Sequence, residues 1–293
     1  GEMLLAAGDT AGAGSIAERV AGTADPGPAR RRAVRLLFEL RLEGDPDAAE
    51  DLLDRYLEEP GVDGELAGAM AAALARARAR RGELEEAEAA LERADGLVPD
   101  DSTFARLELQ RGWLRLMQGR PGAALSALEA GAAVPSGDPT ARAEALLFAD
   151  ALGRADSVRA TELGAGLRAL VADGDAGPLS RAADAWLEEP EAASDAGPAL
   201  VGLAAAALER SGRSKSAGGL RSRLVEAWPD APEAPFALLE LGRSAAPGDP
   251  VRAREWLRRL VVEYPESPAA PLARRILGEL EGSVPAAGAE AGP

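Results

Sequence analysis

The stretch Trp-Pro-Asp-Ala-Pro at residues 228–232 is followed, 36 residues later, by Tyr-Pro-Glu-Ser-Pro at residues 264–268. The same offset relates the Leu-Gly pair at 241–242 to the Leu-Gly pair at 277–278. A constant offset across separate motifs indicates an internal repeat, and a repeat decides the architecture of the whole chain. We therefore predict that the chain is built from units of about 36 residues.

A second pattern describes the turn inside each unit. A glycine is followed five residues later by a small residue and nine residues later by a large one, as in Gly82, Ala87 and Leu91. Glycine accepts the left-handed conformation that ends a helix, and the small residue lets two helices approach closely. The predicted turn glycines are Gly8, Gly44, Gly82, Gly119, Gly174, Gly212, Gly248 and Gly282. Their gaps are 34 to 38 residues, except for the 55 residues from 119 to 174, where we predict one extra helix within 139–172.

The composition agrees with a purely helical fold. Apolar residues make up 46% of the chain and are mostly Ala and Leu, whereas aromatic residues make up only 3%. Closely packed helices use Ala and Leu, while sheets favour β-branched and aromatic residues. We predict an all-α fold without strands, an α-solenoid of about seven helix-turn-helix repeats.

The changes in this pattern divide the chain into six parts. The predicted parts are an N-terminal half repeat (1–26), regular repeats (27–138), an irregular segment with the extra helix (139–173), further regular repeats (174–265), an unpaired C-terminal helix (266–282) and an Ala/Gly/Pro tail (283–293). The composition of the tail is typical of a linker.

The spacing of glycine, small and large residues resembles the tetratricopeptide repeat, a helix-turn-helix unit of 34 residues. The large aromatic residues of that family's first helix are mostly missing. The resemblance implies a right-handed superhelix and a role in protein–protein interaction. The Pro-rich turns at 228–232 and 264–268 also resemble repeats of bacterial cell-envelope proteins. We therefore expect an extracytoplasmic location, in the envelope or outside the cell, after removal of an N-terminal segment that preceded Gly1.

Charge and residue types argue against several classes of function. A formal net charge of −16 repels nucleic-acid phosphates and anionic membranes, so neither is an expected partner. The chain has no Cys and no His, which removes the usual ligands of zinc and the usual activated nucleophiles and bases. No apolar run approaches the ~18 residues of a membrane-spanning helix. We expect no catalytic residues, no metal site and no cofactor.

Two short motifs have alternative interpretations. Residues 12–17 have the outline of a dinucleotide-binding fingerprint, but no strand precedes them, so the start of a helix is favoured. Asp-Gly-Asp at 173–175 begins like a calcium loop, but the other ligand positions of that loop are missing. A turn followed by a helix cap is therefore the favoured interpretation there.

The two ends of the repeat array indicate self-assembly. Residues 12–24 are predicted to be a second helix without its first, and residues 268–281 a first helix without its second. Joining the two across copies would complete a repeat, so we predict a homopolymer that assembles head to tail, such as a filament. The residues predicted to form this contact are Leu4, Leu5, Ala13, Ile16, Ala17, Val20, Leu272, Ala273, Ile276, Leu277, Leu280 and Val284.

An envelope adaptor is the alternative function. A solenoid of this kind can hold a peptide or another protein in a concave groove. We expect such a groove to grip a peptide backbone with Asn, Lys and Arg, but this chain has no Asn and a single lysine, Lys215. The sequence therefore favours a non-catalytic scaffold that binds copies of itself.

Overall fold

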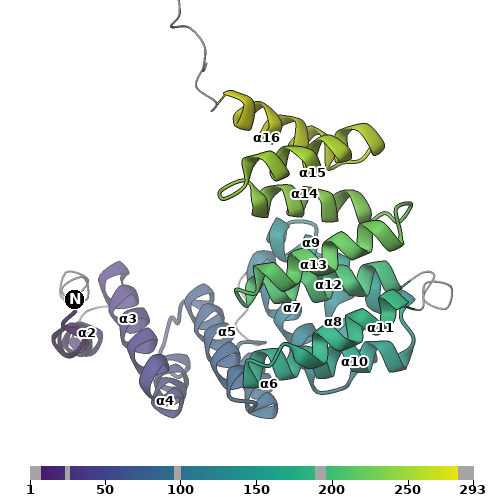
Figure 1. The fold of residues 1–293 in the computed structure, drawn as a ribbon. Coiled ribbons are helices and arrows are strands. Elements are labelled where there is room, and N and C mark those ends of the chain that lie inside the picture. Colours follow the sequence, from purple (N-terminus) through teal and green to yellow (C-terminus); the bar gives the residue numbers. More distant parts are fainter. Residues whose placement is uncertain (1–7, 24–26, 96–99, 189–195, 283–293) are drawn as a thin grey trace, which may run out of the picture. The chain divides into compact units, whose positions relative to one another are not determined.

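The computed structural model describes residues 8–23, 27–95, 100–188 and 196–282. Within these ranges the chain forms α-helices, one π-helical segment and no strand, which confirms the all-helical fold. Figure 1 labels the helices. The chain divides into two compact units. The first comprises residues 1–150 and 171–175, and the second comprises residues 151–170 and 176–293.

In the first unit, each helix from α2 to α7 packs against the next one along the chain. Its helices are α2 Thr10–Thr23, α3 Pro28–Gly44, α4 Pro46–Leu57, α5 Gly64–Arg80, α6 Leu84–Glu92, α7 Asp101–Met117, α8 Pro121–Ala132 and most of α9 Pro139–Arg154. Alternate helices also meet, because α3 contacts α5 and α5 contacts α7. This packing between near neighbours fits an α-solenoid.

The second unit follows the same rule. Its helices are α10 Ser157–Arg168, α11 Gly177–Glu188, α12 Gly197–Arg210, α13 Ser214–Ala227, α14 Ala234–Ala245, α15 Pro250–Glu263 and α16 Ala270–Gly282. The π-helical segment η2, Ala169–Asp173, continues from α10. Successive helices from α10 to α16 pack on one another, and α10 also contacts α12.

Small residues allow the close helix packing inside each pair. The residue five positions after each of six turn glycines is a fully buried alanine. These alanines are Ala13, Ala49, Ala87, Ala124, Ala217 and Ala253. In four of these helices, the residue four positions after the alanine is a leucine that is at most 1% exposed. These leucines are Leu53, Leu91, Leu128 and Leu257. The spacing read from the sequence therefore marks the inner face of the second helix of each pair.

The turn glycines adopt two conformations, and the prediction of a left-handed residue is wrong at two of them. Gly82, Gly119 and Gly212 have φ of 78°, 73° and 79°, as expected for a left-handed helix end. Gly44 and Gly248 do not have positive φ. Both stand in the sequence Gly-Asp-Pro, where the aspartate leaves the helical conformation and caps the next helix, whose first residue is the proline. The turn is then made by aspartate and proline, so glycine need not be left-handed.

The long gap between Gly119 and Gly174 contains three helices, α8, α9 and α10, where the other gaps contain two. An extra helix between 119 and 174 is therefore present. The π-helical segment η2 ends the gap, and a Cβ at Gly82 would lie 3.7 Å from the Ala172 side chain. Ala172, at the end of the irregular segment, thus lies against the turn between α5 and α6.

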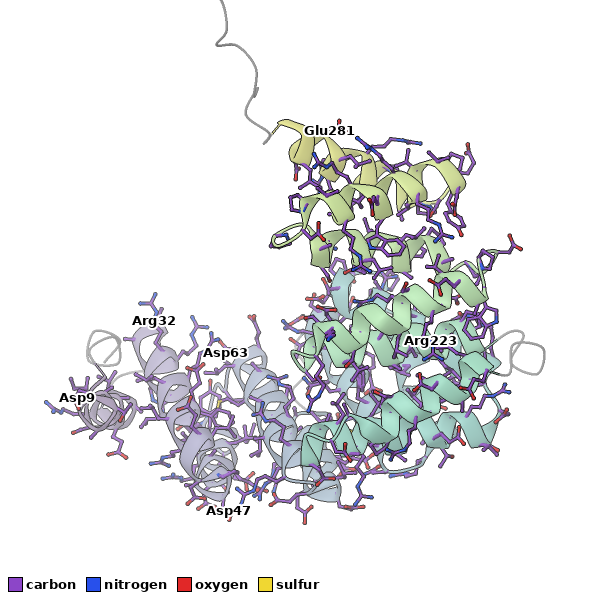
Figure 2. The ribbon with its side chains drawn as sticks, in the orientation of Figure 1. Asp9, Arg32, Asp47, Asp63, Arg223 and Glu281 are labelled. Atoms are coloured by element: carbon purple, nitrogen blue, oxygen red, sulfur yellow. The ribbon has the colours of Figure 1, made fainter. Side chains whose placement is uncertain are left out.

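Charged side chains cover the surfaces of both units (Figure 2). Arg78 of α5 is an exception, because it is only 8% exposed. It is paired with Asp47, Glu50 and Glu83. Burial alone would lower the pKa of Arg78, but the hydrogen bonds to these carboxylates raise it. The arginine therefore stays charged and ties α4 to the turn between α5 and α6.

Candidate functional site

One face of α3 forms the floor of an open groove in the first unit. Arg30, Val34, Leu37 and Arg41 are spaced four, three and four residues apart, so they lie in one stripe along the helix. Val34 and Leu37 are buried, whereas the two arginines are partly exposed. The floor therefore has an apolar centre with a cation at each end.

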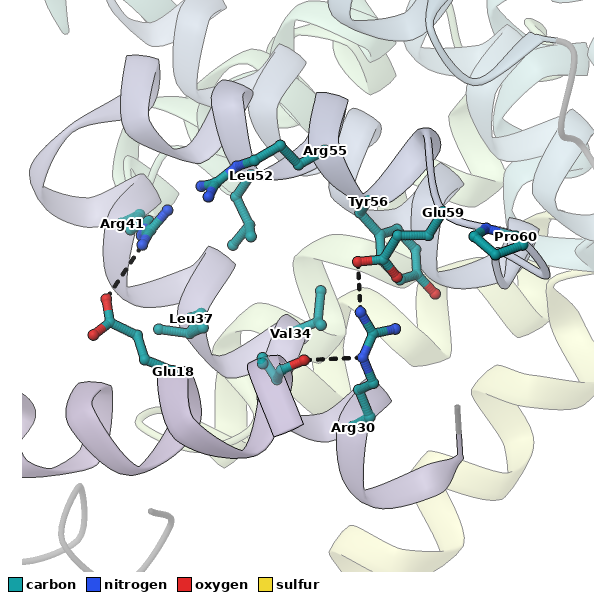
Figure 3. Close-up of a pocket in the computed structure, with 12 residues that line it drawn as sticks. Glu18, Arg30, Val34, Leu37, Arg41, Leu52, Arg55, Tyr56, Glu59 and Pro60 are labelled. Atoms are coloured by element: carbon teal, nitrogen blue, oxygen red, sulfur yellow. Dashed lines mark hydrogen bonds and ion pairs between the residues drawn. The ribbon is translucent and has the colours of Figure 1, made fainter. Parts of the chain in front are cut away.

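Helices α2 and α4 supply the walls of this groove (Figure 3). Glu18 and Ala21 come from α2, whereas Leu52, Arg55 and Tyr56 come from α4. The enclosed volume is about 730 Å³, within the range of ligand sites in proteins. The three helices keep their spacing because Ala17 of α2 packs with Ala33 and Leu37 of α3 in one apolar cluster.

One end of the groove is closed by hydrogen bonds. Arg30 donates from Nε to the carbonyl oxygen of Ala21 at 2.9 Å and pairs with the carboxylate of Glu59. The hydrogen bond to Glu59 raises the pKa of Arg30 against the lowering effect of burial. Burial in turn raises the pKa of Tyr56, whose hydroxyl accepts a hydrogen bond from the backbone N–H of Asp63 at 3.1 Å. The polar groups at this end already have partners inside the chain.

The opposite end retains unused hydrogen-bond donors. Arg41 makes a 3.3 Å contact with Glu18, whose side chain is 61% exposed. Arg55 donates from Nε to the carbonyl oxygen of Asp51 at 3.1 Å, and no carboxylate in the described part of the chain pairs with it. Figure 3 shows both guanidinium groups toward the same end of the groove, away from Arg30. This end can accept an anionic group.

The residues predicted for self-assembly fall into four groups. Ala13, Ala17 and Ala273 are at most 3% exposed, so the chain itself covers them. Ile16 is 37% exposed. Half-buried are Val20, Leu272, Ile276, Leu277 and Leu280. Leu4, Leu5 and Val284 lie outside the described residues. Partly uncovered apolar side chains are therefore present on both α2 and α16.

Comparison with α14 shows which face of α16 is open. A Cβ at Gly242 of α14 would lie 2.6 Å from Leu257 of α15, so this face is covered by the second helix of the pair. A Cβ at Gly278, 36 residues later, would meet no described atom within 4 Å. Leu238, one turn before Gly242, is fully buried, but the corresponding Arg274 is exposed. The pairing face of α16 is thus uncovered and more polar than that of α14.

Sequence reasoning did not find the groove over α3. The spacing of Arg30 and Arg41 around two apolar residues could have indicated the floor. The wall could not have been found in this way. Arg55 lies beside the groove because of the angle at which α4 packs on α3. A pattern within one helix carries no information about that angle.

The described residues contain no group of three His, Cys, Asp or Glu side chains placed to hold a metal ion. None of the described helices is both long and apolar enough to span a bilayer. No protein-family model matches the chain, and no curated protein matches it.

Proposed function

We propose that this chain is a non-catalytic helical-repeat scaffold whose copies bind one another head to tail, α16 of one against α2 of the next. The observation that carries the proposal is the open face of α16 around Gly278, at the position where α15 covers α14. Leu272, Ile276 and Leu280 follow one another at one-turn spacing on another face of the same helix, and each keeps part of its surface exposed. Uncovered apolar surface on a helix is a common mark of an interaction site.

The matching surface on α2 is small and apolar. Ile16 and Val20 are one turn apart and keep part of their surface exposed. A contact between two different surfaces of one chain does not have to close, and repeated it produces a filament. The exposed Arg274 and Arg275 of α16 also reduce the repulsion between two copies that each carry a net charge of −16.

The strength of this contact follows from its area. Full burial of a large apolar side chain contributes about 1.5–3 kcal/mol, and six side chains that are each at most about one third exposed would gain at most on the order of 3–6 kcal/mol together. Association costs roughly 4–15 kcal/mol. We therefore expect reversible assembly that depends on protein concentration.

Mixing two variants tests the head-to-tail contact directly. Ile16→Glu and Ile276→Glu each place a charge on one of the two surfaces, and each variant alone should sediment as a monomer at high protein concentration. A mixture of the two retains one intact pair of surfaces, so it should form a dimer and nothing larger. Analytical ultracentrifugation of the wild type, each variant and the mixture measures all three states.

Val262→Glu is the matched control, because Val262 is a 76% exposed apolar residue on the neighbouring helix α15. This variant should assemble as the wild type does. A wild-type chain that stays monomeric at every concentration, or a mixture that stays monomeric, would rule out the proposal. Circular dichroism of each variant checks that the helices are retained.

Two finer points belong to the same proposal. We propose that the helix pairs are about seven tetratricopeptide-like repeats wound into a right-handed superhelix, supported by the glycine turns and the buried small residues at constant spacing. We also propose that the protein works outside the cytoplasm, in the cell envelope or beyond it. The resemblance of the turns at 228–232 and 264–268 to repeats of bacterial envelope proteins supports that location.

A further inference from the structure

We infer that the groove over α3 binds an acidic, amphipathic segment of a partner protein. The apolar residues of that segment would pack on Ala21 and Leu52, which keep part of their surface exposed, and one carboxylate would lie between Arg41 and Arg55. This inference does not depend on assembly of the chain with itself, because the groove is formed within one copy by α2, α3 and α4.

The dimensions of the groove fit a segment of polypeptide. Arg30 and Arg41 are eleven residues apart on α3, which at about 1.5 Å per residue gives a floor of roughly 16 Å. That length accommodates about three turns of a helix or five residues of extended chain. The groove is open to solvent, so a segment can lie in it without threading.

The charges of the groove select an acidic segment and set its direction. The Arg30 end is closed, since Arg30 already binds Ala21 and Glu59. At the other end, Arg55 uses one donor on its own helix, and Arg41 has one long contact with an exposed carboxylate. Guanidinium groups bind carboxylates through paired, charge-assisted hydrogen bonds. The acidic residue of the partner segment therefore lies at the Arg41 and Arg55 end.

The rest of the molecule makes the groove the favoured binding place for an acidic segment. With a net charge of −16, the molecule repels acidic peptides over most of its surface. The partly exposed wall residues Ala21 and Leu52 add the contact that a bare pair of arginines lacks, because apolar residues bury surface while the carboxylate fixes the register. A segment with two apolar residues one turn apart, followed one turn later by Glu, satisfies both requirements.

The experiment uses the full chain and a peptide of that design. The probe is an end-blocked, fluorescein-labelled amphipathic peptide with two leucines one turn apart and a glutamate one turn later, compared with the same peptide carrying glutamine. Fluorescence anisotropy gives the Kd of each. Arg55→Gln should weaken binding of the glutamate peptide about tenfold, the effect of losing one charge-assisted contact.

Arg32→Gln provides the matched control. Arg32 is exposed on the same helix and extends away from the body of the unit (Figure 2). Arg32→Gln removes one positive charge, as Arg55→Gln does. If the groove is the binding site, Arg32→Gln should therefore change the Kd of the glutamate peptide less than twofold. The glutamine peptide should bind about tenfold more weakly to the wild type and be insensitive to Arg55→Gln.

A charge exchange gives a second, independent readout. Arg55→Glu should lose the glutamate peptide and gain affinity for a peptide with lysine at that position. Equal loss of affinity in Arg55→Gln and Arg32→Gln would overturn the inference, because only the overall charge would then matter. Absence of binding of the glutamate peptide to the wild type would overturn it as well.

Discussion

At the scale of single residues, Asp63 connects three helices of the first unit. Its carboxylate accepts a hydrogen bond from the backbone N–H of Leu66 at 3.1 Å, which caps α5, and it pairs with Arg31 of α3. Its own backbone N–H donates to the hydroxyl of Tyr56 on α4. One residue in the turn between α4 and α5, through its side chain and its backbone, thus fixes α3, α4 and α5 together.

We predict that the contribution of Asp63 depends on pH. The hydrogen bond from Arg31, and then that from Leu66, lowers the pKa of Asp63 in the folded chain. The charge therefore stabilises the fold above the unfolded pKa of about 3.9, and this stabilisation is lost as the pH falls through the lower folded pKa. Since Arg31 is 52% exposed, the effect is limited to about 1 kcal/mol.

Asp63→Asn and Asp63→Ala separate the charge from the cap. Urea unfolding should show Asp63→Asn less stable than the wild type at pH 7, by a margin that shrinks progressively as the pH falls below about 4. Asp63→Ala should cost about 1 kcal/mol more than Asp63→Asn, because only asparagine retains a side-chain acceptor for Leu66. A pH-independent difference between the wild type and Asp63→Asn would mean that the charge of Asp63 contributes nothing.

At the scale of helices, glycines set how closely the two members of a pair approach. Gly242 of α14 lies against Leu257 of α15, so an added Cβ would be 2.6 Å from two atoms of a fully buried leucine. Gly202 of α12, in the same unit, has nothing within 4 Å of the same position. Both residues are inside helices, and only one of them is required by packing.

We predict opposite effects of alanine at these two glycines. Gly242→Ala should destabilise the second unit by about 1–2 kcal/mol, because overpacking at Leu257 exceeds the gain in helix propensity. Gly202→Ala should stabilise the chain by up to ~1 kcal/mol, since it gains helix propensity without a clash. Thermal unfolding followed by circular dichroism measures both. A gain in stability from Gly242→Ala would show that α14 and α15 can separate at no cost.

The helices also show what could be predicted from the sequence. The spacing of Gly82, Ala87 and Leu91 correctly predicted the turn, the close contact and the buried face, because all three depend on residues near in sequence. The conformation of Gly44 was predicted wrongly, since Asp45 and Pro46 offered a second way to make the turn. The groove over α3 was missed because it depends on the packing angles of three helices.

At the scale of the whole molecule, the net charge of −16 opposes compaction. Like charges within a chain destabilise the folded state by mutual repulsion, and salt screens that repulsion with a Debye length of about 10 Å at 0.1 M. Most ion pairs of the described residues are at least partly exposed, and such pairs contribute little to stability. Screening of the repulsion should therefore outweigh the weakening of the ion pairs.

We predict that sodium chloride stabilises the chain. The midpoint of urea unfolding should rise between low salt and about 0.3 M, where the Debye length is roughly 6 Å. Sodium sulfate is not a suitable substitute, because it also strengthens apolar burial. A midpoint that falls with added chloride would indicate that the ion pairs around Arg78 dominate the electrostatic energy.

The packing of each helix on its near neighbours along the chain has a mechanical consequence. In such an array a pulling force is resisted at any moment by one contact between adjacent helices, rather than by the core as a whole. Under tension the helix pairs should detach one after another, and each pair of about 36 residues would release roughly 120 Å of contour length. Between two attachment points, the protein would act as an extensible tether that lengthens stepwise and recoils when the load is removed.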